Sequence, residues 1–485
     1  MMKIRHLGVL CILYILSLPM NAQDKLFTLE DLNFGGTNYA NLRPQNMWLT
    51  WWGEKLIQTD VEECFAIDTK TGKKNLLFSL DDINKWAESD DVKYVRHLMN
   101  ATFPYPDKPI VAVGNRKAFI LVDFEAKKIV WQDSISGQEA NDWNSVSHAT
   151  AYIEDHQLFV VDGQGKKHQL STDGSREIVY GKPVHRNEFG IEKGTFWSPD
   201  GQRLAFYRMD QSMVTDYPQV DIFPREASYE PDKYPMAGMT SHKVTVGIYD
   251  LQTDKTIYLQ AGDPTDRYFT NIAWSPDNKT IYMFELNRGQ NDCRLVSYNA
   301  VTGEKIAELY RETSDQYVEP MHPIQFLPWD DTKFIMQSQK DGYNHLYLFD
   351  KSGKELKQIT NGKWVVLDVV GFNTKTKSVL ILSNESNPLN SNLWTVEIKS
   401  GNRRLMGKGI GVAQSAQPSA TGQMVALKLS SSNHPRIIDV INTNGGGKVT
   451  ELLDAEDPWK DYQQPIFTSG YITAADGKTD LYYRI

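Results

Sequence analysis

The sequence contains little cysteine. Only 3 cysteines occur among its 485 residues, and Cys11 lies in the N-terminal apolar run, so a processed chain would keep Cys64 and Cys293. Exported proteins often form disulfides, but two cysteines so far apart are more often buried thiols than a covalent link. We therefore expect both to be free, and the sequence does not indicate a disulfide-based fold.

Positive charge is also scarce. Lys and Arg total 52 against 61 Asp and Glu, which gives a net charge of −9. The sequence shows no cluster of basic and aromatic side chains that could grip a phosphate backbone. Nucleic acid is therefore not an expected partner.

Catalytic and metal-binding signatures are absent from the sequence as well. It has no G-x-S-x-G nucleophile elbow, no H-E-x-x-H, no C-x-x-C and no G-x-x-x-x-G-K-[ST] loop. The ten histidines are scattered, and no two stand four residues apart as they would in a helical zinc site. We predict no catalytic residue, no metal and no cofactor in this chain.

Only one long apolar run occurs, from Leu7 to about Met20. Two basic residues precede it and small or polar residues follow it, which is the layout of a secretory signal peptide cleaved near residue 22 or 23. The run is short for a transmembrane helix. We predict a signal peptide over residues 1–23 and export to the periplasm or the outside, without stable membrane insertion. An uncleaved N-terminal anchor is the alternative.

Aromatic residues and short repeats, in contrast, are abundant. The chain carries 12 Trp, 23 Tyr and 19 Phe. One phrase recurs eight times: an apolar strand, then Asp, Asn or Glu, then Gly or Lys a few residues later, within alternating runs typical of antiparallel hairpins. The turn residues are Asp68, Asp123, Asp162, Asp250, Asn299, Asp350, Glu397 and Asn442.

The spacing of these turns indicates a propeller. Apart from one pair, neighbouring turns lie 39 to 55 residues apart, which is the period of a four-stranded propeller blade. A second turn phrase upstream of several of them, such as AWSPDNKTIYMF, supplies the other hairpin that such a blade needs. We predict an all-β fold, an eight-bladed β-propeller of four-stranded antiparallel blades over residues 46–462.

The exception is the interval of 88 residues between Asp162 and Asp250, which holds two extra pieces. The first, HRNEFGIEKG, precedes a WSPDG turn phrase. The second, RMDQSMVTDYPQVDIFPREASYEPDKYPMAGMTSHK, separates the strand ending at Tyr207 from the one starting near Val244. Loops this long in a compact fold are usually functional or disordered, and the aromatic and proline content of the second piece favours an ordered insertion.

Candidate binding residues lie in and beside these pieces. Glu188 and Glu192 stand four residues apart among glycines that favour a turn. They are either solvated loop carboxylates or, if one projects into the channel, a site for a cation such as a peptide's α-amino group, which is positive at neutral pH. Arg208 and Asp210 directly follow a strand and are either binding groups or a local pair that braces the insertion. The candidate substrate-binding residues are therefore Glu188, Glu192, Arg208 and Asp210.

The residues of these pieces also resemble a known family. VHRNEFGIEKGTFWSPDGQRLAFYRMDQSMV, YPMAGMTSHKVTVGIYDL and ITAADGKTDLYYRI look like the N-terminal propeller of the prolyl oligopeptidase superfamily, in its dipeptidyl peptidase IV branch, and most closely like the bacterial prolyl tripeptidyl peptidases. The resemblance implies that the segment Arg186–Glu192 supplies a carboxylate that binds the amino terminus of the substrate. Where dipeptidyl peptidases carry two adjacent glutamates, this chain has Arg186 and Asn187, which points to Glu188, with Glu192 as the fallback.

The resemblance also implies the organisation of the chain. Residues 24–45 would be a segment that helps link two domains, and residues 463–485 would begin an α/β-hydrolase domain whose Ser-Asp-His triad lies beyond Ile485. We thus expect a truncated serine exopeptidase, inactive alone. Its propeller admits peptides with a free N-terminus, and with the missing hydrolase domain it releases Pro-ending tri- or dipeptides. Relatives often form homodimers. The alternative is a stand-alone periplasmic binding or scaffold propeller without peptidase activity, because fold alone does not decide function.

Overall fold

The computed structural model describes residues 25–87, 95–114, 118–134, 138–445 and 447–485, so the predicted signal peptide over residues 1–23 lies outside the described residues. The chain forms two units. The larger comprises Met47–Ser430 and Ile438–Leu452. Among the described residues, the smaller comprises residues 25–46 together with Ser431–Ile437 and Leu453–Ile485.

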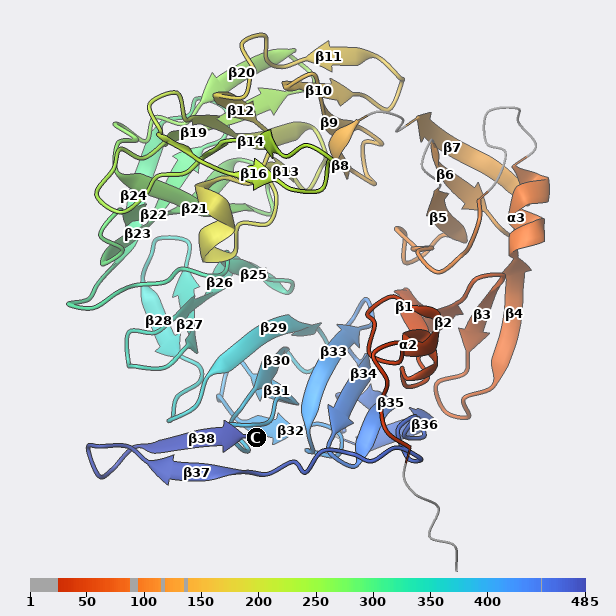
Figure 1. Ribbon diagram of the computed structural model, residues 1–485. Coiled ribbons are helices and arrows are strands. Elements are labelled where there is room, and N and C mark those ends of the chain that lie inside the picture. Colours follow the sequence, from red (N-terminus) through yellow and green to blue (C-terminus); the bar gives the residue numbers. More distant parts are fainter. Residues whose placement is uncertain (1–24, 88–94, 115–117, 135–137, 446) are drawn as a thin grey trace, which may run out of the picture. The chain divides into compact units, whose positions relative to one another are not determined.

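The larger unit is built from eight antiparallel sheets, or blades, that follow one another along the chain (Figure 1). Blade 1 contains β1 (Trp48–Trp52), β2 (Lys55–Thr59), β3 (Glu63–Ile67) and β4 (Lys74–Ser79), and blade 2 contains β5 (Ile110–Gly114), β6 (Ala118–Asp123) and β7 (Lys128–Ser134). Blade 3 contains β8 (Glu139–Trp143), β9 (Thr150–Glu154), β10 (Gln157–Val161) and β11 (Lys167–Gln169). Blade 4 contains β12 (Ile178–Tyr180), β13 (Thr195–Trp197), β14 (Arg203–Asp210), β19 (Lys243–Asp250) and β20 (Lys255–Tyr258). Blade 5 contains β21 (Arg267–Trp274), β22 (Thr280–Asn287), β23 (Asp292–Asn299) and β24 (Lys305–Thr313), and blade 6 contains β25 (Gln325–Leu327), β26 (Asp330–Ser338), β27 (His345–Asp350) and β28 (Glu355–Gln358). Blade 7 contains β29 (Val366–Asn373), β30 (Ser378–Ser383), β31 (Asn392–Glu397) and β32 (Arg403–Leu405). Blade 8 contains β33 (Val412–Pro418), β34 (Met424–Ser431), β35 (His434–Asn442) and β36 (Gly447–Asp454). The predicted all-β, eight-bladed propeller is confirmed.

The strands of each blade follow one another in sequence order from the centre of the ring to its outer side. Figure 1 shows the first strands, among them β1, β21, β25, β29 and β33, toward its centre. The second and third strands carry the core, as in β22, whose residues are buried from Ile281 to Leu286. The last strands are the most exposed, as in β24. A segment that leaves the first strand of a blade therefore starts on the inner side of the ring.

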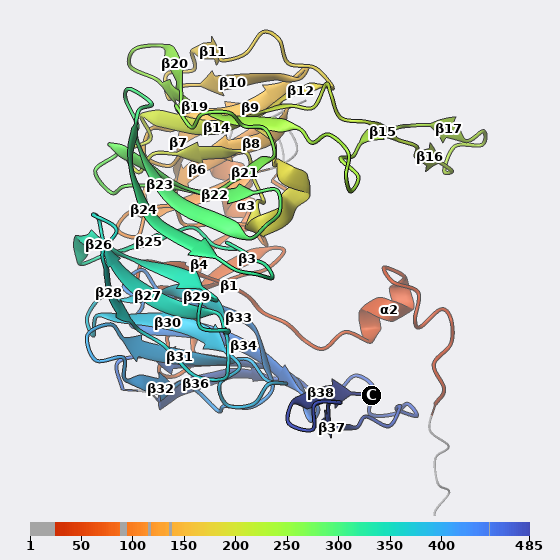
Figure 2. The same ribbon diagram turned by 90° about the vertical axis from the view of Figure 1, so that its left-hand side faces the viewer.

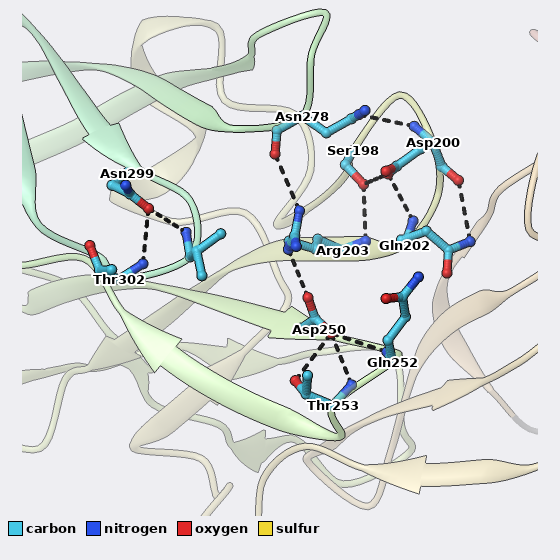
Figure 3. Close-up of polar contacts among 11 residues, drawn as sticks. Ser198, Asp200, Gln202, Arg203, Asp250, Gln252, Thr253, Asn278, Asn299 and Thr302 are labelled. Carbon is cyan, nitrogen blue, oxygen red and sulfur yellow. Dashed lines mark hydrogen bonds and ion pairs between the residues drawn. The ribbon is translucent and has the colours of Figure 1, made fainter.

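Each of the eight predicted turn residues ends, or directly follows, the next-to-last strand of its own blade. In blade 4 a carboxylate oxygen of Asp250 accepts hydrogen bonds from the main-chain N–H groups of Gln252 (3.1 Å) and Thr253 (2.9 Å) (Figure 3). Asn299 does the same for Thr302 (3.0 Å) in blade 5. A short side chain that caps its own turn is the physical reason for the repeat.

The other turn phrase ties blade 4 to blade 5. Ser198 donates to Asp200 (2.6 Å) within the WSPDG turn, and the N–H of Asp200 donates to the side-chain oxygen of Asn278 in blade 5 (3.1 Å) (Figure 3). Arg203, the first residue of β14, pairs with Asp250 (2.8 Å) and joins the two turns of its blade. The chain segments at the two ends of β14 therefore start from a blade that these contacts hold rigidly.

The ring closes through side chains, because blades 1 and 8 each take all their strands from one stretch of chain. The indole N–H of Trp51 donates to the carbonyl of Gln417 (2.8 Å). Glu54 accepts from the hydroxyl of Ser419 and from the N–H of Thr421, both at 2.8 Å. These contacts join the first blade to the last.

The two cysteines and the helices are structural. Cys64 and Cys293 are buried and free, as predicted, and burial raises the pKa of the Cys64 thiol to about 12. The α-helices α2 (Thr37–Asn41) and α3 (Leu80–Trp86) are short. No helix in the described ranges is long and apolar enough to cross a membrane.

The smaller unit contains α2 and the hairpin of β37 (Ser469–Thr473) and β38 (Asp480–Arg484). Arg436 donates to the carbonyls of Pro44 (2.8 Å) and Gln45 (3.0 Å), and the indole N–H of Trp459 donates to the carbonyl of Leu42 (2.9 Å). The N-terminal and C-terminal parts of this unit are therefore held together by direct hydrogen bonds.

Candidate functional site

The first strand of blade 4 is interrupted. β12 pairs with the far end of β14, where Tyr180 faces Arg208, and β13 pairs with its near end, where Thr195 faces Phe206. Between them the chain leaves the sheet as a loop over residues 181–194, here called the arm. The segment starts on the inner side of the ring, where Figure 1 shows its yellow coil near β21.

The base of the arm is fixed at Tyr207, which lies between the two paired stretches of β14. Its N–H donates to the carbonyl of Gly194 and its carbonyl accepts from the N–H of Gly181, both at 2.9 Å. The two glycines pass close to one another, and a Cβ on Gly194 would lie 2.2 Å from the carbonyl oxygen of Lys182. Only glycine permits this crossing.

The tip of the arm has a strained backbone. It is the short 3₁₀ segment η1 (His185–Gly190). Glu188 alone has an extended backbone there, with φ −68° and ψ 164°. The φ angles of the other five residues lie between +54° and +71°. Left-handed backbone costs roughly 1–2 kcal/mol per non-glycine residue, and such strain persists where the surroundings impose it, often at functional sites.

Two buried side chains flank Glu188 and hold the tip. On one side His185 is 1% exposed; the main-chain N–H of Phe269 in β21 donates to its Nε2 (3.2 Å), and its Nδ1 lies 2.7 Å from Nε2 of His242. On the other side Phe189 is 6% exposed and packs edge-on against Tyr268, with ring centroids 5.1 Å apart.

Asn271 connects the tip to two further segments. It lies at an irregularity in β21 and has φ +56°. Its side-chain N–H group donates to the carbonyl of Phe189 (3.1 Å) and also to that of Pro320, in the loop that leads to blade 6. Gly190 follows, and a Cβ there would lie 2.2 Å from the carbonyl oxygen of Met321. The arm is thus packed against blade 5 and against the entry to blade 6.

The insertion over residues 211–242 contributes a third support. It is extended and contains two short ladders, β15 (Asp216–Tyr217) with β18 (Asp232–Lys233) and β16 (Val220–Asp221) with β17 (Ser228–Tyr229) (Figure 2). Arg186 of the arm pairs with Asp232 (2.6 Å) and lies over the ring of Tyr234 (5.1 Å). The expectation of an ordered insertion is met, and it is joined to the arm.

Glu188 is the exposed acidic residue between these anchors. No hydrogen bond or ion pair engages its carboxylate within the described part of the chain. Its charge lies near the hydroxyl of Tyr268: burial raises the pKa of Tyr268, and the negative charge of Glu188 raises it further. An unpaired carboxylate beside an aromatic ring suits a cationic ligand.

Glu192 is also exposed, on the returning limb of the arm. Its neighbours are fixed: Ile191 is buried in the core shared by blades 4 and 5, and Lys193 pairs with Asp142 of β8 (3.2 Å). The structure therefore brings Glu188 and Glu192 onto one arm, with Glu188 in its tip and Glu192 on its returning limb.

Arg208 and Asp210 lie elsewhere. They are the last residues of β14 and do not follow the strand as the sequence suggested, because β12 extends the ladder to Asp210. They do not pair with each other among the described contacts. Arg208 donates to the hydroxyl of Tyr180 (2.8 Å) and to Asp173 (3.0 Å). Asp210 accepts from the N–H and hydroxyl of Ser212.

Sequence reasoning missed the residues that support the tip. His185, His242, Tyr268 and Asn271 carry no motif of their own, and a buried His pair that lies 57 residues apart has no signal in one sequence. No group of three or more His, Cys, Asp or Glu in the described ranges could hold a metal ion.

The fold and the arm define a propeller domain with an interrupted inner strand. The family model described as "Dipeptidyl peptidase IV (DPP IV) N-terminal region" matches residues 109–436, and the chain belongs to this family. A crystal structure of a "putative dipeptidyl aminopeptidase IV" from Bacteroides ovatus is 41% identical with a TM-score of 0.87, and the match covers 95% of this chain and 67% of that one. The dipeptidyl peptidase 4 of Porphyromonas gingivalis, 20% identical with a TM-score of 0.77 and 95% of this chain covered against 66% of that one, has the same fold.

Fungal proteins are similar in sequence. A "Probable dipeptidyl-aminopeptidase B" of Talaromyces marneffei is 25% identical over 343 residues, which cover 62% of this chain and 38% of that protein. One of Phaeosphaeria nodorum is 27% identical over 313 residues, which cover 58% of this chain and 34% of that protein. The match thus spans little more than a third of the length of these curated relatives.

Proposed function

We propose that this chain is the substrate-admitting propeller of an exported serine exopeptidase, and that Glu188 binds the free amino terminus of the peptide. The observation that carries the proposal is the exposed, unpaired carboxylate of Glu188 on an arm that leaves the inner strand of blade 4. The family supports the reaction class, since it is named after dipeptidyl peptidase IV. Glu192 is the alternative ligand on the same arm.

The chemistry follows from charge. A peptide's α-amino group is cationic at neutral pH, and a charge-assisted hydrogen bond to a carboxylate contributes about 1.5 to 3 kcal/mol. An acetylated amino terminus has no such charge. Binding at Glu188 therefore selects peptides with free N-termini and excludes internal segments of longer chains.

A fixed anchor also measures length. An extended peptide advances about 3.3 Å per residue, so the distance from the Glu188 carboxylate to a serine nucleophile would set whether two or three residues are released. We propose release of Pro-ending tri- or dipeptides by acyl transfer to a serine. The Ser-Asp-His triad belongs to an α/β-hydrolase domain, and this chain should be inactive without it.

The smaller unit offers a surface for that domain. Large apolar side chains are exposed there, including Phe34 (86%), Ile466 (88%) and Ile485 (77%). Exposed apolar groups gathered in one unit favour association with a further protein surface. We propose that the hydrolase domain covers them.

Binding of two matched peptides tests the proposal. One is a Pro-containing peptide with a free amino terminus and a C-terminal fluorophore, and the other is its N-acetylated twin. The free peptide should bind at least about tenfold more tightly, and Glu188→Gln should remove this difference while leaving the acetylated peptide unaffected. Glu192→Gln is the matched control on the same arm and should bind like the wild type.

The result that contradicts the proposal is equal affinity for the two peptides, or an unchanged preference in Glu188→Gln. If only Glu192→Gln removes the preference for the free peptide, then Glu192 and not Glu188 binds the amine. The chain alone should also release no chromophore from a Pro-ending peptide anilide.

A further inference from the structure

His185, which lies in the same short segment as Glu188, forms a buried pair with His242. They are 1% and 4% exposed, and their ring nitrogens lie 2.7 Å apart. His185 begins the strained tip of the arm, whereas His242 ends the insertion, one residue before β19. The pair therefore fastens two segments that leave blade 4 at different points.

The hydrogen bonds of the pair have a direction. The main-chain N–H of Phe269 donates to Nε2 of His185, so that nitrogen carries no proton and the proton of the neutral ring lies on Nδ1. Nδ1–H of His185 then donates to Nε2 of His242, whose own proton must lie on Nδ1. Each ring accepts a hydrogen bond at Nε2, so an additional proton could bind only there. On His185 this proton would face the N–H of Phe269, and on His242 it would face Nδ1–H of His185.

The surroundings also oppose an additional proton. Burial lowers the pKa of His185 well below its ordinary value, and burial together with the positive charges of Arg288 and Arg186 lowers the pKa of His242 to about 4. The charged and titratable groups that face the pair are Arg186 with its partner Asp232, Arg288 with its partner Asp266, and Tyr268 with the nearby Glu188. The pair is neutral at physiological pH.

We propose that His185 and His242 are positioning residues of the amine site: their directional hydrogen-bond chain locks the left-handed tip and so holds the Glu188 carboxylate where a peptide amine meets it. The inference rests on the proposed function. Phe189 and Asn271 hold the tip after Glu188, and His185 is the buried anchor before it, next to the exposed Arg186–Asp232 pair. Without His185 the strained backbone relaxes, and only that exposed pair holds the tip before Glu188.

Two amide substitutions at position 242 separate positioning from packing. In His242→Gln the amide oxygen stands near the place of Nε2 and can still accept from Nδ1–H of His185. In His242→Asn the shorter side chain reaches only the place of Nδ1, so the acceptor is lost although size and polarity change little. His242→Leu removes the acceptor altogether.

The experiment measures the affinity of the whole chain for the free and N-acetylated fluorescent peptides. His242→Asn and His242→Leu should each weaken binding of the free peptide about tenfold and leave the acetylated peptide unchanged. His242→Gln should stay within about threefold of the wild type. In a Glu188→Gln background, His242→Asn should change the affinity less than about twofold, because its effect acts through Glu188.

A buried histidine in another blade is the control. His345 is fully buried and bonds to Thr360 and to the carbonyl of Gly362 in blade 6. His345→Leu should lower the unfolding temperature without changing either affinity. If His242→Leu does not fold, the Gln and Asn variants still decide.

Three results would overturn the inference: wild-type affinity of His242→Asn for the free peptide, an equal loss for both peptides, or the same tenfold loss in the Glu188→Gln background. A failure of the proposed function looks different. In that case Glu188→Gln itself has no effect on the free peptide.

Discussion

The side-chain amide of Asn271 donates a hydrogen bond to the main-chain carbonyl of Phe189 at 3.1 Å and also donates to the carbonyl of Pro320. One amide group therefore joins the arm of blade 4, the first strand of blade 5 and the loop that leads to blade 6. Asn271 is 8% exposed and has a left-handed backbone, φ +56°, which asparagine adopts more readily than most residues. The arm depends on its neighbours as much as on its own blade.

Substitution of Asn271 should weaken both the fold and the amine site. Asn271→Gly keeps the left-handed backbone and removes the amide, and the buried carbonyls left without a donor should cost about 1–3 kcal/mol. Asn271→Ala adds roughly 1–2 kcal/mol of backbone strain. The unfolding temperature should therefore be highest for the wild type, lower for Asn271→Gly and lowest for Asn271→Ala. Both variants should lose affinity for the peptide with a free amino terminus by the same factor. Equal stability of wild type and Gly would show that the amide does not stabilise the arm.

The buried histidines should make the protein less stable in acid. The pKa of His242 falls from an ordinary 6.5 to about 4 in the folded protein, so below pH 6.5 the unfolded chain binds a proton that the folded protein does not. The folded state is fully stable above pH 6.5 and loses about 3 kcal/mol from this residue as the pH falls to about 4. His185, whose pKa is lowered as well, adds to the loss.

Urea unfolding between pH 7 and pH 4 checks this dependence. His242→Gln has no titrating group at this position, so its stability should fall less steeply over the same range. Between pH 7 and pH 4, the free energy of unfolding of the wild type should therefore fall by about 3 kcal/mol more than that of the variant. Parallel curves would mean that His242 is protonated in the folded protein.

Arg208 should act on stability and not on amine recognition. Its guanidinium is already engaged by the hydroxyl of Tyr180 and by Asp173, which ties the end of β14 to the segment before β12. Arg208→Lys loses the planar pair of contacts and should lower the unfolding temperature without changing the ratio of free to acetylated affinity. Equal weakening of both peptides at unchanged stability would instead assign Arg208 to binding the peptide chain.

The repeat of the fold could be predicted from sequence because its cause is local. In seven of the eight turns a short Asp or Asn side chain accepts main-chain N–H groups two to four residues on, as Asp250 does, whereas Glu397 accepts from the hydroxyl of Ser400. The same residue types therefore recur in the sequence near the end of each blade. The arm was also visible, because it interrupts this period. Counting such turns was enough to predict eight blades.

The interior of the site could not be predicted in the same way. β12 and β13 are three residues each, and their pairing with β14 depends on contacts that no local pattern records. Asn271 is 82 residues from Phe189, and its hydrogen bond requires an irregularity in β21. The sequence therefore indicated which carboxylates lie on the arm but not which residues hold them.

The tip of the insertion should mediate self-association of the chain. Its apolar side chains are largely exposed, among them Val220 (58%), Ile222 (75%) and Phe223 (96%), and two short ladders hold the tip away from blade 4 (Figure 2). Ordered apolar groups in this position favour contact with another protein surface, and we expect that surface to be a second copy of the chain. Phe223→Asp should therefore lower the molar mass measured by light scattering from dimer to monomer. Val301, equally apolar and 57% exposed on a turn of blade 5, provides the control: Val301→Asp should remain dimeric, and a wild-type chain that is monomeric at every concentration would contradict the prediction.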